Sequence, residues 1–576
     1  MFGRKTVIST RFWSVFVASI FAIINSYILI LTDSVVAGQF VGDDAVAAMT
    51  LVFPIFTLIL FVAYLVADGL VMMASYAQGR SDRAEVDRLF SLGIILAVGC
   101  SLILFTALFF LREQILDSWE VSPNLRFFAG EYYSGLIFWI LFQLVSVFNY
   151  TIFFSEGMER ACLVASSVSF IINVILDIVL CQNFGVRGVG LATTLGTLTS
   201  VLIQIYYLTG GRSQLHFTWH WNLKKIWRGV VYSFYHSMDT LFISILPIIF
   251  SMYVINYFGD EKLIIVTVVI NLLTLVITVF TGVIDCLQPM ICQYHAENNL
   301  HSVIKTMRLG MAVTVALGLI IIFVGMIFAD FLPLMFGVTD SNLAEEAAEA
   351  MRYLLPFIIF LGLVMILGHY YIYIGELNYG AVVKIFLLLI LPLAGMFLSG
   401  LFALNILGKY SINIFWLGIG VSFLVTYLVN YFYLRRRNGL LMVDKKILDR
   451  QLSYDVNATS DEIMALTRQI DDELKRRGVT DKIRNKIVLC VEEFGMHAVE
   501  RVERADKKIF QLEFSIFLED KITVIIRDNG KTYDVVKTAQ EKNFNFREFF
   551  IEGVTAQFAQ RKYNFGGDEN RMTLQF

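Results

Sequence analysis

Long apolar runs with few charges fill the first three quarters of this chain. Each run is long enough for a helix to cross the hydrocarbon core of a bilayer, so a window of about 19 residues predicts about twelve membrane-spanning helices. The runs lie near residues 12–32, 46–77, 91–111, 132–154, 162–182, 188–208, 229–255, 263–292, 309–329, 353–374, 381–404 and 411–433. Polar sequence follows Tyr433. The pattern therefore predicts an all-α polytopic membrane region followed by a small soluble domain.

Basic residues in the short connections predict the orientation. If every run spans the bilayer, these residues fall on one side, and the positive-inside rule makes that side the cytoplasm. We therefore expect a multi-pass protein of the plasma (inner) membrane with both termini in the cytoplasm. The residues are Arg4, Lys5, Arg11, Arg80, Arg83, Arg88, Arg160, Arg212, Lys224, Lys225, Arg228, Lys305, Arg308, Arg435, Arg436 and Arg437.

Composition supports the membrane interpretation and excludes some others. The chain is 57% hydrophobic and 16% charged, which is too apolar for a soluble protein of 576 residues. The net charge of −3 is close to neutral and gives no reason to expect a nucleic-acid partner. The six cysteines form no CxxC pair, and most of them stand alone in apolar runs, so burial explains them better than metal binding.

One segment of the chain recurs. Gly42 to Gly93 can be laid on Gly259 to Gly310 at a constant offset without a gap, so that the Gly-Asp pair at 42–43, Asp68 and the Leu-Gly pair at 92–93 all have counterparts. Because an even number of helices fills each half, the repeat is parallel, related by an axis along the membrane normal. Transporters of this plan bind substrate between the halves, near the middle of the membrane.

Three motifs resemble the multidrug and toxic compound extrusion (MATE) family of the larger flippase superfamily. They are Tyr27-Ile-Leu-Ile-Leu-Thr-Asp33, Asn173-Val-Ile-Leu-Asp177 and Leu191-Ala-Thr193-Thr194. The resemblance implies two six-helix lobes, over residues 1–220 and 221–440, that form a V-shaped cavity. It also implies exchange of protons or sodium for amphipathic, often cationic, compounds. Two features depart from the family: no proline precedes Pro54, and acids stand at positions 68 and 285.

Carboxylates at bilayer depth are costly and indicate function. The resemblance places five residues in a polar site inside the first lobe, namely Asp33, Asn149, Asn173, Asp177 and Thr194. It also makes the two acids of this set candidate sodium ligands. Because a cation and a basic drug both favour the ionised carboxylate, competition for it would couple their movements. The alternative is that Asp177 braces its helix through Asn173 without titrating.

The second lobe offers further candidates for cation or substrate binding. Asp239 follows Gly229 at the spacing at which some members of the family place an acid. Asp68 and Asp285 are equivalent in the repeat and either face each other across the pseudo-twofold axis or hydrogen-bond within their own lobes. His236 and His369 are single membrane histidines that neighbouring helices can satisfy.

The soluble domain, predicted over residues 455–576, combines helices and strands in an α+β sandwich. Helical periodicity covers 461–477 and 481–503, and alternating strands cover 509–517 and 522–526 before a last strand at 572–576.

This order resembles the histidine-kinase-like ATPase fold, in particular its anti-sigma-factor kinase branch. By that resemblance Glu493 is a general base, Asp528 and Gly530 receive the adenine, and Gly553 stands in the phosphate lid. His497 replaces the asparagine that holds magnesium, and imidazole suits Mg²⁺ poorly. The resemblance leaves three possibilities open. The domain is a regulatory module, an active kinase or a degenerate scaffold. As a regulatory module it would bind ATP, another adenine nucleotide or a cytoplasmic protein.

Taken together, the sequence predicts a secondary-active H⁺- or Na⁺-coupled antiporter rather than an enzyme. Its expected cargo is amphipathic, cationic small molecules, and its tail is a regulatory domain. Transport driven by nucleotide hydrolysis is the least favoured possibility, because the chain contains no GxxxxGK[ST] loop. Two alternatives remain: a membrane-anchored signalling protein whose tail binds or phosphorylates a regulator, and a lipid flippase. Flippases of the same superfamily usually have an Arg-rich cavity, and these helices contain almost no arginine.

Overall fold

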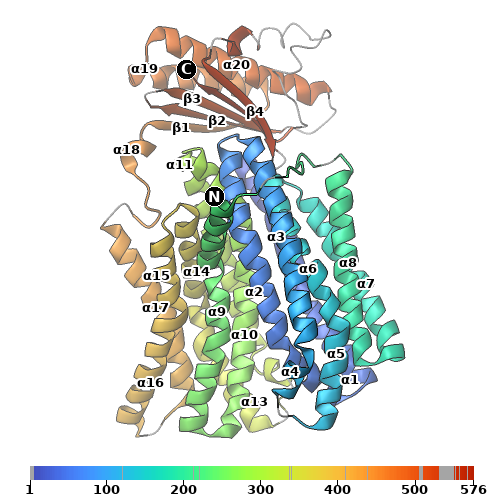
Figure 1. Ribbon diagram of the computed structural model, residues 1–576. Helices are drawn as coiled ribbons and strands as arrows, with labels where there is room; N and C mark the ends of the chain where they lie inside the picture. The colour runs from blue at the N-terminus through green and yellow to red at the C-terminus, as the bar shows by residue number, and fades with distance from the viewer. Residues whose placement is uncertain are drawn as a thin grey trace.

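The computed structural model shows a bundle of long helices that carries a small domain at one end (Figure 1). We call the end of the bundle that meets this domain the tail side and the opposite end the far side. The structure describes residues 5–119, 121–211, 213–219, 221–335, 338, 340–408, 410–436, 439–504, 510–519, 521–530, 551, 553–556, 558–566 and 569–575.

The predicted membrane region is confirmed. Within the described residues, 12 helices are long and apolar enough to cross a membrane. The first lobe contains α1 Val7–Phe40, α2 Asp43–Gly79, α3 Arg83–Phe110, α4 Arg112–Asp117, α5 Pro123–Leu136, α6 Ile140–Glu156, α7 Glu159–Phe184 and α8 Val186–Thr209. The second contains α9 Leu223–Phe258, α10 Leu263–Ala296, α11 Leu300–Ile327, α12 Leu332–Met335, α13 Ser341–Leu354, α14 Ile358–Tyr373, α15 Leu377–Ile385, α16 Leu391–Leu407 and α17 Ile412–Arg435.

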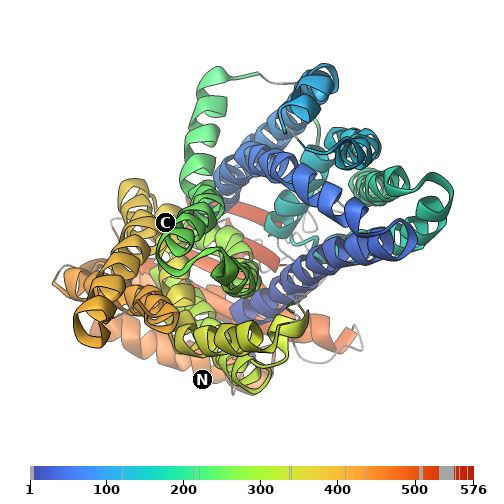
Figure 2. The same ribbon diagram turned by 90° about the horizontal axis from the view of Figure 1, so that it is seen from below.

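Local sequence explains where these helices begin. Thr6 and Ser9 form a reciprocal capping box at the start of α1. Ser122 caps α5, and Pro123 occupies the first helical position, where a missing N–H is harmless. Figure 2, seen from the far side, shows the helices of the first half gathered apart from those of the second.

The two lobes approach most closely near the tail side, where α2 packs against α9 and α10. A Cβ atom at Gly79 of α2 would lie 2.3 Å from the carbonyl oxygen of Gln293 in α10. Further from the tail in α2, a Cβ atom at Gly69 would lie 1.9 Å from the carbonyl oxygen of Gly229 in α9. Only glycine permits such backbone contact, so these positions close the bundle toward the tail.

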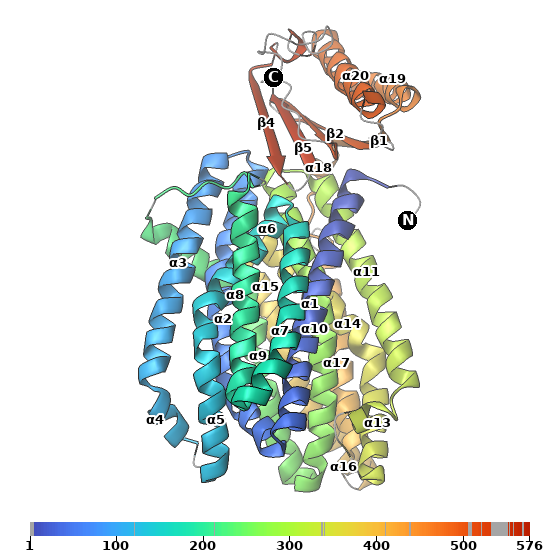
Figure 3. The ribbon, with the colours of Figure 1, turned by 90° about the vertical axis from the view of Figure 1, so that its right-hand side faces the viewer.

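The tail domain is a five-stranded antiparallel sheet with two helices on one face. The strand order is β1-β2-β3-β5-β4, and the apolar core between the sheet and α19 and α20 is separate from that of the bundle. The elements are α18 Lys445–Leu448, β1 Gln451–Asn457, α19 Ser460–Arg476, α20 Asp481–Arg504, β2 Gln511–Leu518, β3 Ile522–Asp528, β4 Gln560–Gly566 and β5 Glu569–Gln575. Figure 3 shows the sheet lying between its helices and the bundle.

The predicted helices and strands of the tail correspond to α19, α20, β2, β3 and β5, but two strands were missed. One of them, β1, begins before the predicted boundary at residue 455 and pairs with β2 from Gln451 onward. The sequence does contain the alternation that predicts a strand here, because Leu452, Tyr454 and Val456 alternate with polar residues. Residue 509, at the start of a predicted strand, and the 531–534 part of the proposed adenine motif lie outside the described residues.

We expect Gly79→Ala to destabilise the closed bundle. The added methyl group meets backbone atoms of α10 that cannot rotate away, and overpacking of this kind costs about 1–3 kcal/mol. A thermal melt of the purified protein in detergent measures the loss. The matched control is Gly99→Ala in α3, where a Cβ atom meets nothing within 4 Å. Equal melting temperatures for the two variants would contradict the close approach of the lobes.

Candidate functional site: a cavity between the lobes

Both lobes line a cavity of about 540 Å³, a size suited to a drug-like ligand. Its wall combines aromatic and apolar side chains with polar ones, and it reaches from the middle of the bundle toward the far side along α1 and α2. The lining contains four acids, Asp33, Asp68, Asp239 and Asp285, and two histidines, His236 and His369, and among the described residues it includes neither lysine nor arginine.

In the first lobe, Asp33 of α1 and Asp177 of α7 form a buried carboxyl pair. Asp33 is 6% exposed and Asp177 is 0% exposed, and the two groups lie close enough to interact directly. Thr193 Oγ1 donates to Asp33 Oδ2 at 3.1 Å. No described residue donates to Asp33 Oδ1 or to either oxygen of Asp177. Two such carboxyl groups cannot both be ionised at this depth without a positive partner.

The other candidates of the first lobe divide into two groups. Asn173 lies one turn from Asp177 and donates weakly to Thr193 at 3.5 Å, so it belongs to the pair. Thr194 instead donates to the carbonyl oxygens of Gly135 and Gly190, and Asn149 donates to Gln204 at 3.2 Å. These two residues stabilise helix packing, and Thr193 is the hydroxyl that contacts the acids.

In the second lobe, Asp239 of α9 is paired with a lysine that the sequence analysis overlooked. Lys384 Nζ, 1% exposed, lies 2.7 Å from Asp239 Oδ1. His369 Nε2 lies 2.8 Å from the same ammonium and 3.4 Å from the carboxylate. Lys384 stands alone in an apolar run, which was the available signal, and a π-helical stretch, Phe386–Ile390, follows it directly. Such stretches frequently occur at functional positions.

Asp68 connects the lobes rather than bonding within its own, so the prediction of hydrogen bonds within one lobe is wrong for this residue. Its carboxylate contacts His236 Nδ1 at 3.0 Å and accepts a hydrogen bond from Ser237 at 3.0 Å, and both partners belong to α9. His236 Nε2 then contacts Tyr373 at 2.9 Å. Asp285 lies in the cavity wall and within electrostatic range of Asp68. The two equivalent acids therefore line the same cavity.

The tail residues predicted to bind adenine are already engaged by the protein. Asp528 pairs with Arg501 of α20 at 3.1 Å and accepts hydrogen bonds from Gly530 and Asn570, each at 2.9 Å. A Cβ atom at Gly530 would lie 2.6 Å from the Arg501 guanidinium. Arg501 therefore covers the surface on which a base would lie.

The remaining nucleotide candidates lie on the helical layer and in the segment before β4. Glu493 is half-buried and His497 is buried, one turn apart on α20. Gly553 is exposed, with open space around it.

Two six-span lobes with an acidic cavity between them define a membrane transporter of the two-lobed, pseudo-symmetric class. The MatE family model matches residues 18–179 and 237–397, which together exceed half of the chain. The chain therefore belongs to the MatE family, whose members are transporters of small organic compounds rather than enzymes. A search of curated proteins found no match.

Solved structures share the fold at low identity. A MOP superfamily transporter from Pyrococcus furiosus Vc1 (DSM3638), noted for the reverse polarity of its binding pocket, gives a TM-score of 0.68 at 17% identity over 75% of this chain and 96% of that one. An outward-facing multidrug resistance MATE family transporter gives 0.68 at 17% over 74% and 95%. A MATE in the bent conformation gives 0.65 at 16% over 74% and 95%. At these identities the likeness shows the fold alone.

We expect Lys384→Met to destabilise the protein strongly, because it leaves Asp239 buried beside His369 without its cation. Breaking one half of a buried ion pair costs about 3–5 kcal/mol. The double variant with Asp239→Asn should recover most of that loss, which a double-mutant cycle of melting temperatures measures. Arg126→Met, which breaks an exposed pair with Asp117, is the control and should cost less than about 1 kcal/mol. Equal losses for Lys384→Met and this control would contradict the buried pair.

Proposed function

We propose that this chain is a secondary-active antiporter that exports amphipathic cations in exchange for protons or sodium, with its tail side in the cytoplasm. The observation that carries the proposal is the Asp33–Asp177 pair. Three of its four carboxylate oxygens receive no hydrogen bond from the described residues, and Asp33 opens into the shared cavity. A buried negative group of this kind is stable only when a proton, a metal cation or a cationic ligand joins it.

The oxygens around this pair fit either coupling ion. Asn173 Oδ1, one turn from Asp177 on α7, also lacks a donor among the described residues, and carboxylate and amide oxygens are ligands that hard cations prefer. A proton needs only one carboxyl group, shared with its neighbour by a hydrogen bond. In both cases the cargo and the ion compete for one negative site, and this competition couples their movements in opposite directions.

The cavity supports cationic cargo over lipid phosphate. Asp239 is balanced by Lys384, but Asp33, Asp68 and Asp285 remain in a wall whose described residues include no lysine or arginine. These three acids attract positive groups and repel anionic ones. The aromatic side chains Phe53, Phe56 and Trp139 in the same wall offer faces for stacking on a cation. The export interpretation is therefore favoured over a flippase of anionic lipid.

We expect Asp177→Asn to abolish gradient-driven transport. An amide cannot exchange a proton or balance a cation, and Asp33 alone is then left to do so. Dye efflux from proteoliposomes driven by a pH or sodium gradient should therefore fall at least about tenfold. Asp117→Asn, an exposed acid on the far side, is the matched control and should transport normally. Undiminished gradient-driven efflux by a folded Asp177→Asn protein would overturn the proposal.

For the tail we propose regulation rather than phosphoryl transfer. The engagement of Asp528 by Arg501 disfavours adenine binding, and His497 disfavours magnesium. We expect no saturable binding when full-length protein is titrated with a fluorescent ATP analogue at micromolar concentrations. Saturable binding that Asp528→Asn abolishes would restore the nucleotide interpretation, and Asp461→Asn, an exposed acid at the start of α19, is the control.

A further inference from the structure

The two lobes present equivalent turns on the tail side. The turn between α2 and α3 contains Ser81, and the turn between α10 and α11 contains Asn298; both residues have φ of 57°. The next residue caps the following helix in each case, because Asp82 accepts from the Glu85 N–H and Asn299 from the Ser302 N–H, both at 3.1 Å. The sequence repeat thus produces a pair of matching turns.

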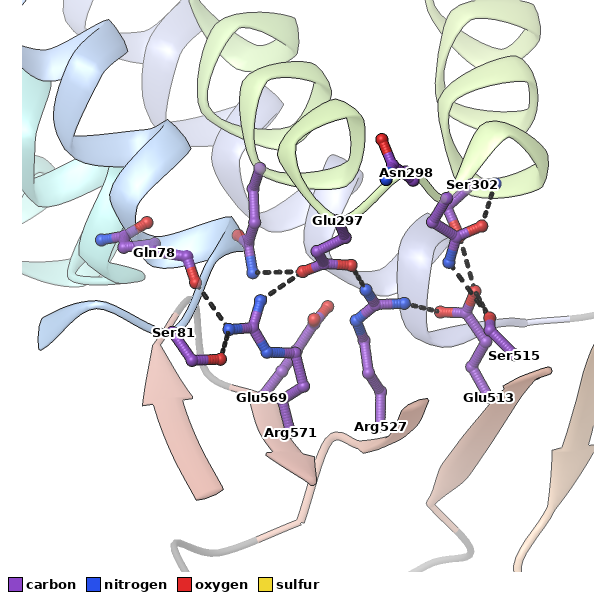
Figure 4. Close-up of polar contacts among 12 residues, drawn as sticks. Gln78, Ser81, Glu297, Asn298, Ser302, Glu513, Ser515, Arg527, Glu569 and Arg571 are labelled. Carbon is purple, nitrogen blue, oxygen red and sulfur yellow. Dashed lines mark hydrogen bonds and ion pairs between the residues drawn. The ribbon is translucent and has the colours of Figure 1, made fainter. Parts of the chain in front are cut away.

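The polar face of the tail sheet lies across both turns. On the second lobe, Asn299 donates to Ser515 of β2 at 3.0 Å, and Ser302 donates to Glu513 at 2.6 Å. On the first lobe, Arg571 of β5 donates to the carbonyl oxygen of Gln78 at 2.5 Å and to Ser81. One sheet therefore contacts the equivalent turn of each lobe (Figure 4).

A single guanidinium joins the two turns. Arg571 binds Gln78 and Ser81 of the first lobe through Nη2 and Glu297 of the second lobe through Nη1. The chain of charges continues from Glu297 to Arg527 of β3 and from Arg527 to Glu513 at 3.0 Å. Figure 4 shows Arg571 between Ser81 and Glu297.

Most of these charged groups are buried, and burial raises the pKa of Glu513 to about 7. The side chains of Arg527, Glu513 and Glu297 are 0%, 0% and 1% exposed. Burial lowers the pKa of Arg527 and of Arg571 to about 10, so both remain charged at neutral pH. The ion pairs of this interface join four cations to four carboxylates among the described residues, namely Arg11, Lys305, Arg527 and Arg571 with Glu297, Glu513, Asp455 and Glu569.

Separation of the lobes would break part of this network of ion pairs. If their tail-side ends separate, Arg571 must leave either Glu297 or the turn of the first lobe. A buried charge that loses its partner is strongly destabilising. The sheet must therefore dissociate from the two turns when the lobes separate. Undocking and tail-side opening are therefore coupled.

We propose that the C-terminal domain is a latch: its sheet, through Arg571, holds the tail-side ends of the two lobes together and must release them before the bundle opens on that side. Its role in transport rests on the proposed antiport cycle. The latch itself concerns the distance between the lobes, which is measurable without transport.

Double electron–electron resonance on the full chain tests the latch. Spin labels are attached at Arg160→Cys in α7 and Arg308→Cys in α11, both exposed positions in different lobes, with Cys100→Ser removing the one cysteine that is not fully buried. The parent should show one narrow distance. Arg571→Leu should add a second population at longer distance, because it removes the side chain that binds the matching turns of both lobes.

The control and the second variant separate bridging from general loosening. Lys305→Leu removes an ion pair with Asp455 that joins the tail to the second lobe alone, and it should keep the parental distance. Arg571→Lys retains the charge, but one ammonium group cannot span both turns, so it should also add the longer population.

Several outcomes would overturn the latch. These are a single parental distance in folded Arg571→Leu and Arg571→Lys proteins, or a shift in Lys305→Leu as large as theirs. If Arg571→Leu does not fold, Arg571→Lys decides by the same criterion. Dye efflux measured on the same preparations separates the two proposals: distances that respond without any gradient-driven efflux support the latch and reject the antiporter.

Discussion

A charge buried in a low-dielectric interior is stable only beside an opposite charge or enough hydrogen-bond donors. The buried ionisable groups of this molecule form two sets, those with such a partner inside the protein and those without one. Asp239 satisfies this requirement with Lys384, and Glu297 satisfies it with Arg527 and Arg571. Asp33 and Asp177 do not satisfy it from within the described protein. The satisfied groups hold helices and sheet in place, whereas the proposed function assigns the carboxyl pair a positive partner from outside the protein.

Contacts between the two lobes close the bundle on the tail side. Backbone contacts at Gly69 and Gly79 bring α2 against the second lobe, and Tyr76 donates to the carbonyl oxygen of Tyr373 from the same region. The cavity extends away from these contacts toward the far side. The part of the cavity that contains Asp33 therefore lies on the far side of these contacts, and the docked sheet contacts both lobes on the tail side.

Periodicity and repeat made the architecture predictable, because each span is a local property of about 20 consecutive residues. The site was less predictable because it depends on contacts between distant segments. Asp239 and Lys384 are 145 positions apart, and nothing local marks the lysine as the partner of that acid. Thr193 and Thr194 are adjacent, and only the rotation of α8 decides which of them faces Asp33. The docking of Arg571 on Gln78, 493 positions away, has no local signal at all.

The two copies of the repeat share backbone conformation, but the contacts of their equivalent side chains differ. Ser81 and Asn298 keep the same left-handed conformation, and helices of both lobes keep the same order. Asp68 and Asp285 occupy equivalent positions, yet Asp68 binds His236 across the lobes and Asp285 faces the cavity. The second lobe neutralises its deep acid with Lys384, whereas no lysine or arginine among the described residues pairs with Asp33 or Asp177. The two lobes therefore share a backbone plan but differ in charge, and the proposed exchange of ions belongs to the lobe whose carboxyl pair has no internal cation.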